Sequence, residues 1–288
     1  KVDVALATMT QEERKKLQEK LSPTMSMNRI GKMVAIMSGK GGVGKSSVTA
    51  LLASALQRQG LQIGVLDADV TGPSIPKLFG ITGPVSGTPM GIVPIKTETE
   101  IKVISTNLML PEEDMAVIWR GPIMGNTIKQ FWTDVAWGKL DYLLLDLPPG
   151  TSDATLTVMQ AMPLDGVVMV TTPQSLSSMV VRKTVNMSQE LDTPILGIVE
   201  NMSHFIAPDT GTKYDIFGPS HSQKIADLAE APIIGQIPID PQLTKLADAG
   251  EIETYEHQAC ADLAKAFIKH VPVREPTSSL PWMRHVGT

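Results

Sequence analysis

Short apolar runs alternate along this chain with longer segments of helical character. A nearly continuous apolar run is typical of a parallel strand that is covered on both faces of a sheet. Strands are predicted at residues 34–37, 63–66, 101–105, 142–145, 167–170, 195–199 and 233–237. Helices are predicted between or after these strands, at residues 47–56, 125–135, 175–191, 222–229 and 259–271.

The alternation of strand and helix predicts an α/β fold, with one doubly wound, mostly parallel sheet and helices on both of its faces. Residues 80–99 are rich in Gly, Pro and Thr and predict a loop with a short hairpin. In a doubly wound sheet, ligands bind at the carboxyl ends of the strands. Residues that directly follow the strands are therefore the first candidates for a functional site.

Two segments lie outside this alternation. Thr10 and Glu13 form a capping box, which predicts a polar helix up to about residue 21, where Ser22-Pro23 ends it. We divide the chain into an N-terminal helical arm at residues 1–30, a central α/β domain at residues 31–272 and a C-terminal tail at residues 273–288.

A phosphate-binding pattern lies between the first predicted strand and the first predicted helix. It reads Gly39-Lys40-Gly41-Gly42-Val43-Gly44-Lys45-Ser46 and fits G-x-x-x-x-G-K-[ST] in the strand, loop and helix context that the pattern requires. The glycines let backbone N–H groups turn toward phosphate oxygens, and the helix N-terminus adds the positive end of its dipole. Lys45 is expected to reach the β- and γ-phosphates, and the Ser46 hydroxyl to ligate Mg²⁺. These residues, with Ser47, predict a site for ATP.

Carboxylates follow two further predicted strands, at the edge of the sheet where such a nucleotide would lie. Asp146 resembles the acidic residue that holds the Mg²⁺ shell in phosphate-loop NTPases, through water. We expect Asp69 to contact Mg²⁺ in the same way and to orient a water for attack on the γ-phosphate, with Asp67 as the alternative. A lone aspartate at a strand end serves equally well as a turn or cap residue. Pro148-Pro149-Gly150 predicts a stiff turn that γ-phosphate binding could reposition.

Composition restricts the function further. The chain has 288 residues, of which 42% are hydrophobic, so it can bury a large core. Its net charge of −5, its pI of about 5.6 and the lack of a long basic run argue against a nucleic-acid partner. No apolar stretch approaches the roughly 18 residues of a membrane span, and the single cysteine, Cys260, fits a reducing compartment. We expect a cytoplasmic protein without nucleic-acid or membrane partners.

Five segments, taken in order along the chain, together resemble one family. They are the loop at 39–46, D-A-D…G-P-S-I-P at 67–76, L-P-E-E…W-R-G-P at 110–122, D-Y…D-L-P-P-G-T at 141–151 and V-E-N-M-S at 199–203. Over residues 33–268 the chain resembles the Mrp/ApbC-type nucleotide-binding proteins, relatives of MinD and ParA within the deviant Walker ATPases. The resemblance implies a slow ATPase that forms homodimers and works with iron–sulfur assembly or client proteins.

The resemblance also assigns roles to single residues. Lys40, the second lysine of the loop, is expected to reach across the dimer to the partner's nucleotide and to offset charge in the transition state, as an arginine finger does. The alternative is a lysine that only faces solvent. Asn201 is expected to contact adenine, and the base pocket to be lined by Pro238, Ile239 and Asp240. The implied catalytic residues are Lys40, Lys45 and Asp69.

One part of the sequence departs from the family. Members hold an iron–sulfur cluster between subunits through a C-x-x-C pair just after E-N-M-S, and here Ala207 and Thr210 occupy the two cysteine positions. Alanine has no donor atom, and a threonine hydroxyl is a poor ligand for iron in a sulfide cluster, which requires thiolates. His204, His221 and Asp209 are the remaining candidate ligands, although such side chains in loops are usually solvated. The family implies a cluster, and these substitutions argue against it.

Three functions remain open from the sequence. The first is a dimeric, ATP-hydrolysing nucleotide switch of the iron–sulfur cluster carrier and assembly family that lacks the ligand pair. The second is a non-enzymatic, nucleotide-dependent scaffold or regulatory paralogue. The third is a positioning ATPase of the MinD or ParA kind, which calls for an amphipathic membrane helix or a basic DNA-binding face. The tail segment 278–284 is too short for such a helix and is broken by Pro281.

Overall fold

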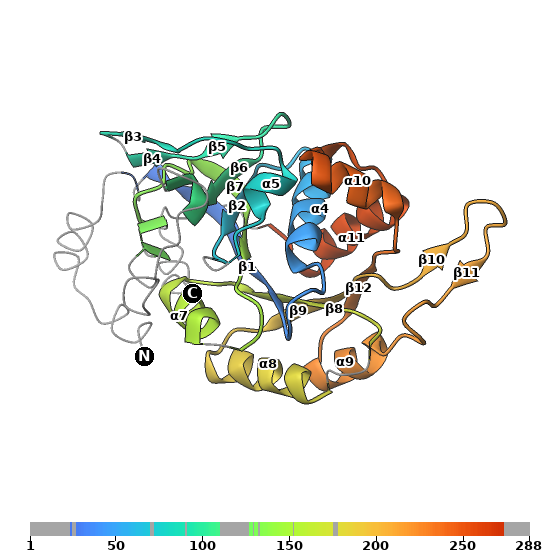
Figure 1. Cartoon of the computed structure of the whole chain (residues 1–288). Helices are drawn as coiled ribbons and strands as arrows, with labels where there is room; N and C mark the ends of the chain where they lie inside the picture. The colour runs from blue at the N-terminus through green and yellow to red at the C-terminus, as the bar shows by residue number, and fades with distance from the viewer. Residues whose placement is uncertain are drawn as a thin grey trace.

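Eight strands form the central sheet of this protein, in the order β12-β9-β8-β1-β7-β2-β6-β5 (Figure 1). The computed structural model describes residues 24, 27–69, 72–89, 91–109, 127–128, 130–131, 133–151, 153–174 and 178–273. The predicted arm helix at residues 10–21 and the tail beyond residue 273 lie outside the described residues.

All seven predicted strands are present in the sheet. They are β1 (Arg29–Ser38), β2 (Ile63–Asp67), β6 (Lys102–Ser105), β7 (Lys139–Asp146), β8 (Gly166–Thr171), β9 (Ile195–Glu200) and β12 (Ile233–Gln236). The first of them begins at Arg29 rather than at residue 34. These strands pair in parallel, and only the edge strand β5 (Ile95–Lys96) runs antiparallel to its neighbour β6. The predicted doubly wound, mostly parallel sheet is confirmed.

Helices cover both faces of the sheet (Figure 1). One face carries α4 (Lys45–Gln57), the short α5 (Ile75–Leu78), α10 (Pro241–Ala249), α11 (Gln258–His270) and two 3₁₀ turns, η1 (Thr106–Met109) and η2 (Ile252–Thr254). The other carries α7 (Asp153–Ala161), α8 (Ser178–Glu190) and α9 (Ser222–Ala229). The helices α4, α8, α9 and α11 correspond to predicted ones, and the described residues between 127 and 133 are helical as predicted. None of the described helices has the length and apolar character needed to cross a bilayer.

Alternate side chains of β1 enter two separate cores. Val34 and Ile36 belong to a buried cluster that includes side chains of α4 and α11. Met33, Ala35 and Met37 belong to a second cluster, which includes side chains of α7. Burial on both faces explains why this strand is a continuous apolar run rather than an alternating one. The carboxyl end of β1 is therefore fixed by packing on both sides, and the phosphate-binding loop starts from that end.

Two small hairpins lie outside the central sheet. β3 (Ser86–Thr88) and β4 (Gly91–Val93) form the hairpin predicted within residues 80–99. A second hairpin, of β10 (Phe205–Ile206) and β11 (Lys213–Tyr214), projects from the body of the protein (Figure 1). Its strands have two residues each, too short to give a periodic sequence signal. It carries Ala207 and Thr210, the two positions at which the resemblance implies cysteines.

The base of the β10–β11 hairpin is joined to the loop between β12 and α10. The backbone N–H of Ile239 donates to the carbonyl of His204 at 2.7 Å, and Phe205 forms a parallel bridge with Ile239. The backbone N–H and the hydroxyl of Ser203 both donate to the carbonyl of Ile237, at 2.9 and 3.0 Å. The V-E-N-M-S segment thus connects the hairpin to residues 237–240, which are predicted to line the base pocket.

Candidate functional site

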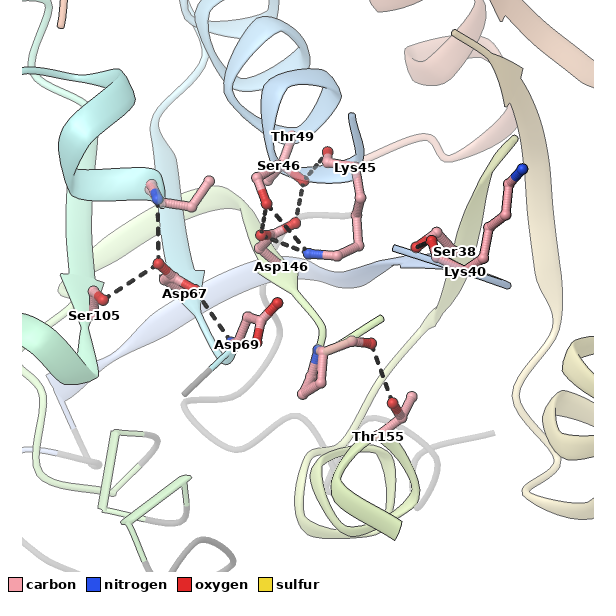
Figure 2. A network of polar contacts seen from close by, with 12 residues as sticks. Ser38, Lys40, Lys45, Ser46, Thr49, Asp67, Asp69, Ser105, Asp146 and Thr155 are labelled. Carbon is pink, nitrogen blue, oxygen red and sulfur yellow. Dashed lines mark hydrogen bonds and ion pairs between the residues drawn. The ribbon is translucent and has the colours of Figure 1, made fainter. Parts of the chain in front are cut away.

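The carboxyl ends of three neighbouring strands, β1, β7 and β2, meet at one edge of the sheet (Figure 2). The strand register places Asp146 at the end of β7 beside Ile36 of β1 and beside Asp67 at the end of β2. Both carboxylates have no exposed surface. Buried charges need partners, because burial without compensation is costly. The partners of each carboxylate therefore indicate what this edge of the sheet is built to do.

The loop from residue 39 to residue 44 connects β1 to α4. Gly42 and Gly44 have φ angles of 78° and 77°, in the left-handed region that favours glycine. At Gly44 a Cβ atom would lie only 2.3 Å from Nδ2 of Asn201, whereas at Gly41 nothing lies within 4 Å. Gly44 is thus required both by the backbone conformation and by the close approach of Asn201. Gly41 and Gly42 are exposed at the tip of the loop.

The carboxylate of Asp146 contacts three polar side chains at the start of α4 (Figure 2). Its Oδ2 atom lies 2.7 Å from Nζ of Lys45 and accepts a hydrogen bond from the Ser46 hydroxyl at 2.5 Å. Its Oδ1 atom accepts from the Thr49 hydroxyl at 2.8 Å. Lys45 is only 6% exposed, so this is a buried ion pair with hydrogen bonds on both carboxylate oxygens. Ser47, the next residue of the helix, is partly buried.

Asp67 is fully engaged in holding the turn that follows β2. Its Oδ1 atom accepts from the backbone N–H of Asp69 at 3.1 Å, and its Oδ2 atom accepts from the N–H of Ile75 at 3.2 Å and from the Ser105 hydroxyl at 3.3 Å. Burial raises the pKa of the Asp67 carboxyl to about 8, and the charge of Asp146 adds to the shift. Asp67 is therefore an anchor for this turn. This supports the choice of Asp69 over Asp67 as the water-orienting residue, which stays a prediction.

The Pro148-Pro149-Gly150 segment is attached to the end of β1. The N–H of Gly150 donates to the carbonyl of Ser38 at 2.8 Å, and the N–H of Leu147 donates to the carbonyl of Ile36 at 3.1 Å. The Thr155 hydroxyl, at the start of α7, donates to the carbonyl of Pro148 at 3.1 Å (Figure 2). The segment thus lies directly beside the start of the phosphate-binding loop, as a switch that senses a γ-phosphate would require.

Asn201 approaches the phosphate-binding loop from β9. Its Nδ2 atom donates to the carbonyl of Val43 at 2.9 Å, and the residue is 5% exposed. Asp240 has both carboxylate oxygens engaged, since Oδ1 caps α10 by accepting from Gln242 N and Oδ2 accepts from the Tyr255 hydroxyl, each at 2.8 Å. Pro238 is buried and Ile239 is partly buried. Asn201 thus contacts the loop, and residues 237–239 are hydrogen-bonded to the segment that follows it. The contact of Asn201 and of residues 238–240 with adenine stays a prediction.

Lys40 takes no part in the Asp146 cluster. Its side chain extends away from Asp146 (Figure 2), and its Nζ atom donates to Oε1 of Gln174 at 3.2 Å in an exposed hydrogen bond. The two lysines of the loop therefore differ in their surroundings. Lys45 is buried against a carboxylate of its own chain, whereas Lys40 is directed outward.

The residues at this edge of the sheet fit Mg²⁺. The Ser46 hydroxyl and the Asp146 carboxylate are oxygen donors 2.5 Å apart, and Mg²⁺ prefers such hard oxygen ligands together with water and phosphate. Asp69 follows two residues after the end of the adjacent strand and is 8% exposed. The three predicted metal-site residues thus belong to the same edge of the sheet.

The tip of the β10–β11 hairpin does not fit an iron–sulfur cluster. The turn is closed by two backbone hydrogen bonds, from Ala207 N to Thr212 O at 3.0 Å and from Gly211 N to Ala207 O at 2.8 Å. Neither Ala207 nor Thr210 offers a thiolate. Cys260 is buried in α11, and burial raises the pKa of its thiol to about 11, so it stays protonated at neutral pH.

His204, His221 and Asp209, the remaining candidate ligands, do not come together as a ligand set among the described residues. Within the ranges that the structure describes, no three or more His, Cys, Asp or Glu side chains come close enough together to hold a metal ion. His204 is instead paired with the hydroxyl of Ser203, whose Oγ lies 2.9 Å from its Nδ1. Burial, followed by the charge of Lys213, lowers the pKa of His204, which keeps the imidazole neutral at physiological pH.

A glycine loop between a strand and a helix, whose lysine and serine face an aspartate at the end of the neighbouring strand, defines a P-loop NTPase. The chain matches the family model of the NUBPL iron-transfer P-loop NTPases (ParA) over residues 29–272. It belongs to this family, which confirms the resemblance seen in the sequence motifs.

Individual relatives agree with this assignment. The chain is 47% identical to an iron–sulfur cluster carrier protein of Methanocaldococcus jannaschii over 228 residues, 78% of each chain. It is 42% identical to a cytosolic Fe-S cluster assembly factor of Saccharomyces cerevisiae over 234 residues, 78% of this chain and 80% of the relative. Among solved structures, an Archaeoglobus fulgidus nucleotide-binding protein in complex with ADP superposes with a TM-score of 0.75 at 42% identity, covering 88% of this chain and 98% of that one. The MinD ATPase of Pyrococcus furiosus, at 22% identity and a TM-score of 0.63, shares the fold.

Thr49 is the one residue of the Asp146 cluster that the motif does not name. It follows Ser46 by three residues, and residues three apart on a helix lie on the same face. The helical spacing was therefore a usable signal for Thr49. The role of Asp67 as an anchor had no such signal, because its partners Ile75 and Ser105 come from other parts of the chain.

Proposed function

We propose that this protein is an ATP-binding and ATP-hydrolysing nucleotide switch. The observation that supports this best is the contact set around Asp146, in which Lys45 and Ser46 lie within 2.7 Å of one carboxylate oxygen. Both side chains that the phosphate-loop pattern names are present and engaged, Lys45 buried against Asp146 and Ser46 partly buried and hydrogen-bonded to it. A site that had lost its function would be under no constraint to keep a buried ion pair, which contributes little to stability compared with apolar packing.

Each residue of the cluster has a distinct task in this proposal. Ser46 and Asp146 would hold Mg²⁺, Asp146 through water, and the ion would neutralise negative charge on the bound triphosphate. Lys45 moves from Asp146 to the phosphates, because the triphosphate carries the larger negative charge. Asp69 orients the attacking water, with its position fixed by the anchor Asp67.

We assign Lys40 to the nucleotide of a second copy of the chain. The side chain is directed away from the Asp146 cluster of its own subunit, and its hydrogen bond to Gln174 is exposed, so little is lost when it leaves. A cation that arrives from a partner subunit offsets the charge that develops in the transition state. The active form is then a homodimer with two nucleotides, each contacted by Lys45 of its own subunit and by a partner's Lys40 residue.

The biological role that we propose is iron–sulfur cluster assembly in the cytoplasm. The names of the relatives, a cluster carrier and a cytosolic assembly factor, support this choice. Since Ala207 and Thr210 offer no thiolates, the chain acts on assembly or client proteins through its nucleotide-dependent shape rather than through a cluster bridged by its own subunits. Anaerobic reconstitution with iron and sulfide should therefore leave less than one cluster per dimer, and a stoichiometric cluster would refute this part.

The nucleotide assignment is tested by comparing Lys45→Ala with Lys96→Ala. Lys96 lies in an exposed pair with Glu100 and is a matched control for the loss of a lysine. Lys45→Ala should reduce Mg²⁺-dependent ATP turnover by roughly 10²–10³-fold, the range for removal of one transition-state charge partner. Lys96→Ala should behave as the original protein. ATP that binds but returns unchanged from the original protein would favour a non-enzymatic scaffold, and unchanged binding and turnover in Lys45→Ala would refute the site.

A further inference from the structure

We infer that Thr49 is a positioning residue for the Mg²⁺ site, holding the Asp146 carboxylate in place while Lys45 and Ser46 engage the nucleotide. The inference rests on the proposed function and adds to it a residue that the phosphate-loop pattern does not contain. Its basis is the geometry of the Asp146 cluster (Figure 2).

The contacts of Asp146 fall into two sets. Oδ2 receives Lys45 and Ser46, the two side chains that phosphate and Mg²⁺ attract in the proposed complex. Oδ1 accepts a hydrogen bond from the Thr49 hydroxyl at 2.8 Å. Among the described residues, no other side chain donates to this oxygen. When the nucleotide draws Lys45 and Ser46 away from Oδ2, the Thr49 hydrogen bond is the side-chain contact that stays. Asp146 then keeps its orientation, with Oδ2 directed to the metal and its waters.

Thr49 is well suited to this task. It has no exposed surface and lies one turn into α4, where helical packing fixes its backbone. Its hydroxyl is also 3.0 Å from the carbonyl of Lys45. A hydroxyl has only one proton to donate. The contact with Asp146 is the shorter of the two and its acceptor is charged, so it is the stronger hydrogen bond. The β-branched side chain has few rotamers, so the hydroxyl is held on Asp146 at low entropic cost.

A hydrogen bond to a metal-ligating carboxylate orients that carboxylate and so influences the affinity for the metal. Loss of such an outer-shell partner typically weakens metal affinity or activity by about 10–100-fold. The binding of the nucleotide without metal depends instead on the loop amides and on Lys45. Removal of the Thr49 hydroxyl should therefore separate these two quantities, weakening the metal-dependent part of binding and sparing the metal-independent part.

The experiment measures ADP binding by calorimetry in EDTA and over a Mg²⁺ titration, for the original protein and three variants. Thr49→Val keeps the shape and removes the hydroxyl, and Thr49→Ser restores the hydroxyl. Ser54→Ala is the matched control, because Ser54 is buried on the same helix and its hydroxyl donates to the backbone carbonyl of Ala50 alone. We expect Thr49→Val to raise the half-saturating Mg²⁺ concentration about tenfold, with ADP affinity in EDTA unchanged. Thr49→Ser and Ser54→Ala should stay within about twofold of the original protein.

The outcomes distinguish this inference from the proposed function. An unchanged Mg²⁺ dependence in Thr49→Val, or an equal loss of ADP affinity in EDTA and in Mg²⁺, would overturn the role of Thr49 while the nucleotide site stands. Failure of Thr49→Ser to rescue the Mg²⁺ dependence would do the same. Should the original protein bind no ADP at all, the proposed function itself fails. If Thr49→Val does not fold, Thr49→Ala takes its place, because it also removes the hydroxyl that Asp146 accepts. The same rise in the half-saturating Mg²⁺ concentration is then expected, and an unchanged Mg²⁺ dependence in Thr49→Ala would overturn the inference.

Discussion

The phosphate-binding end of the sheet and the β10–β11 hairpin are the two regions to which the sequence motifs assign function, and they are built in opposite ways. At the sheet, Asp67 and Asp146 are fully buried and every carboxylate oxygen has a partner. In the hairpin, Ile206 and Tyr214 are 45% and 52% exposed, and the turn is held by backbone hydrogen bonds. The residues of the phosphate-binding loop lie where packing and hydrogen bonds constrain them. The proposed substitution of cluster ligands at Ala207 and Thr210 falls where the turn is held by backbone hydrogen bonds.

Among variants that compare the two regions, Asp146→Asn is expected to lower the free energy of unfolding the most. The change leaves Lys45 buried without its carboxylate partner, and breaking a buried pair in this way lowers the free energy of unfolding by about 3 kcal/mol. Glu100→Gln, which breaks the exposed pair with Lys96, should lower it by less than about 1 kcal/mol. Urea denaturation of both variants measures the difference. Equal losses would mean that Asp146 is not the structural centre of the site.

Two glycines of the same loop give the next largest contrast. Gly44→Ala places a Cβ 2.3 Å from Asn201 at a φ of 77°, so it should lower the free energy of unfolding by about 1–3 kcal/mol and disturb nucleotide binding. Gly41→Ala meets nothing within 4 Å and should fold as the original protein does. Thermal unfolding and ADP titration of the pair report both properties. A destabilisation that is as large at Gly41 as at Gly44 would show that the loop is built differently.

The reactivity of Cys260 in α11 shows whether its thiol can serve as a cluster ligand, since Ala207 and Thr210 of the hairpin offer none. Burial raises the pKa of Cys260 from 9.0 to about 11. At pH 8 we therefore expect a thiol reagent to label the folded protein at least about 100-fold more slowly than the urea-unfolded protein, since labelling requires opening of the structure. Because the pKa of the Cys260 thiol is higher in the folded protein than in the unfolded chain, the unfolded chain loses the thiol proton first as pH rises. The free energy of unfolding should therefore fall between pH 9 and pH 11. Fast labelling of the folded protein would make Cys260 a candidate ligand.

The smallest effect is expected in the hairpin itself. Ile206→Ser and Tyr214→Ser change exposed side chains and should alter the free energy of unfolding by no more than about 0.5 kcal/mol. Leu52→Ala in α4, a residue with no exposed surface, should cost about 3 kcal/mol in the same assay. If the hairpin variants unfolded as readily as Leu52→Ala, the hairpin would have to be counted as part of the core.

The sequence predicted the phosphate-binding end well, because its signals are local. A continuous apolar strand, a glycine pattern and a helix occupy consecutive residues, and the strand ends locate Asp67 and Asp146. The anchor role of Asp67 and the β10–β11 hairpin depend on segments that are distant in the sequence, which no local pattern reports. Helix α10 is a different case, since Asp240, Pro241 and Gly250 are recognisable start and stop signals. The resemblance assigns Asp240 to the base pocket, which stays a prediction, and the structure adds its role as the N-cap of α10.

Single-turnover hydrolysis with protein in excess over ATP tests the central claim most directly. The claim is that this chain is a working nucleotide switch although Ala207 and Thr210 of its hairpin offer no thiolate for a cluster. With Mg²⁺, all of the bound ATP should be converted to ADP and phosphate, and in EDTA it should be recovered intact. ATP that is bound in the presence of Mg²⁺ and recovered unchanged would contradict the account.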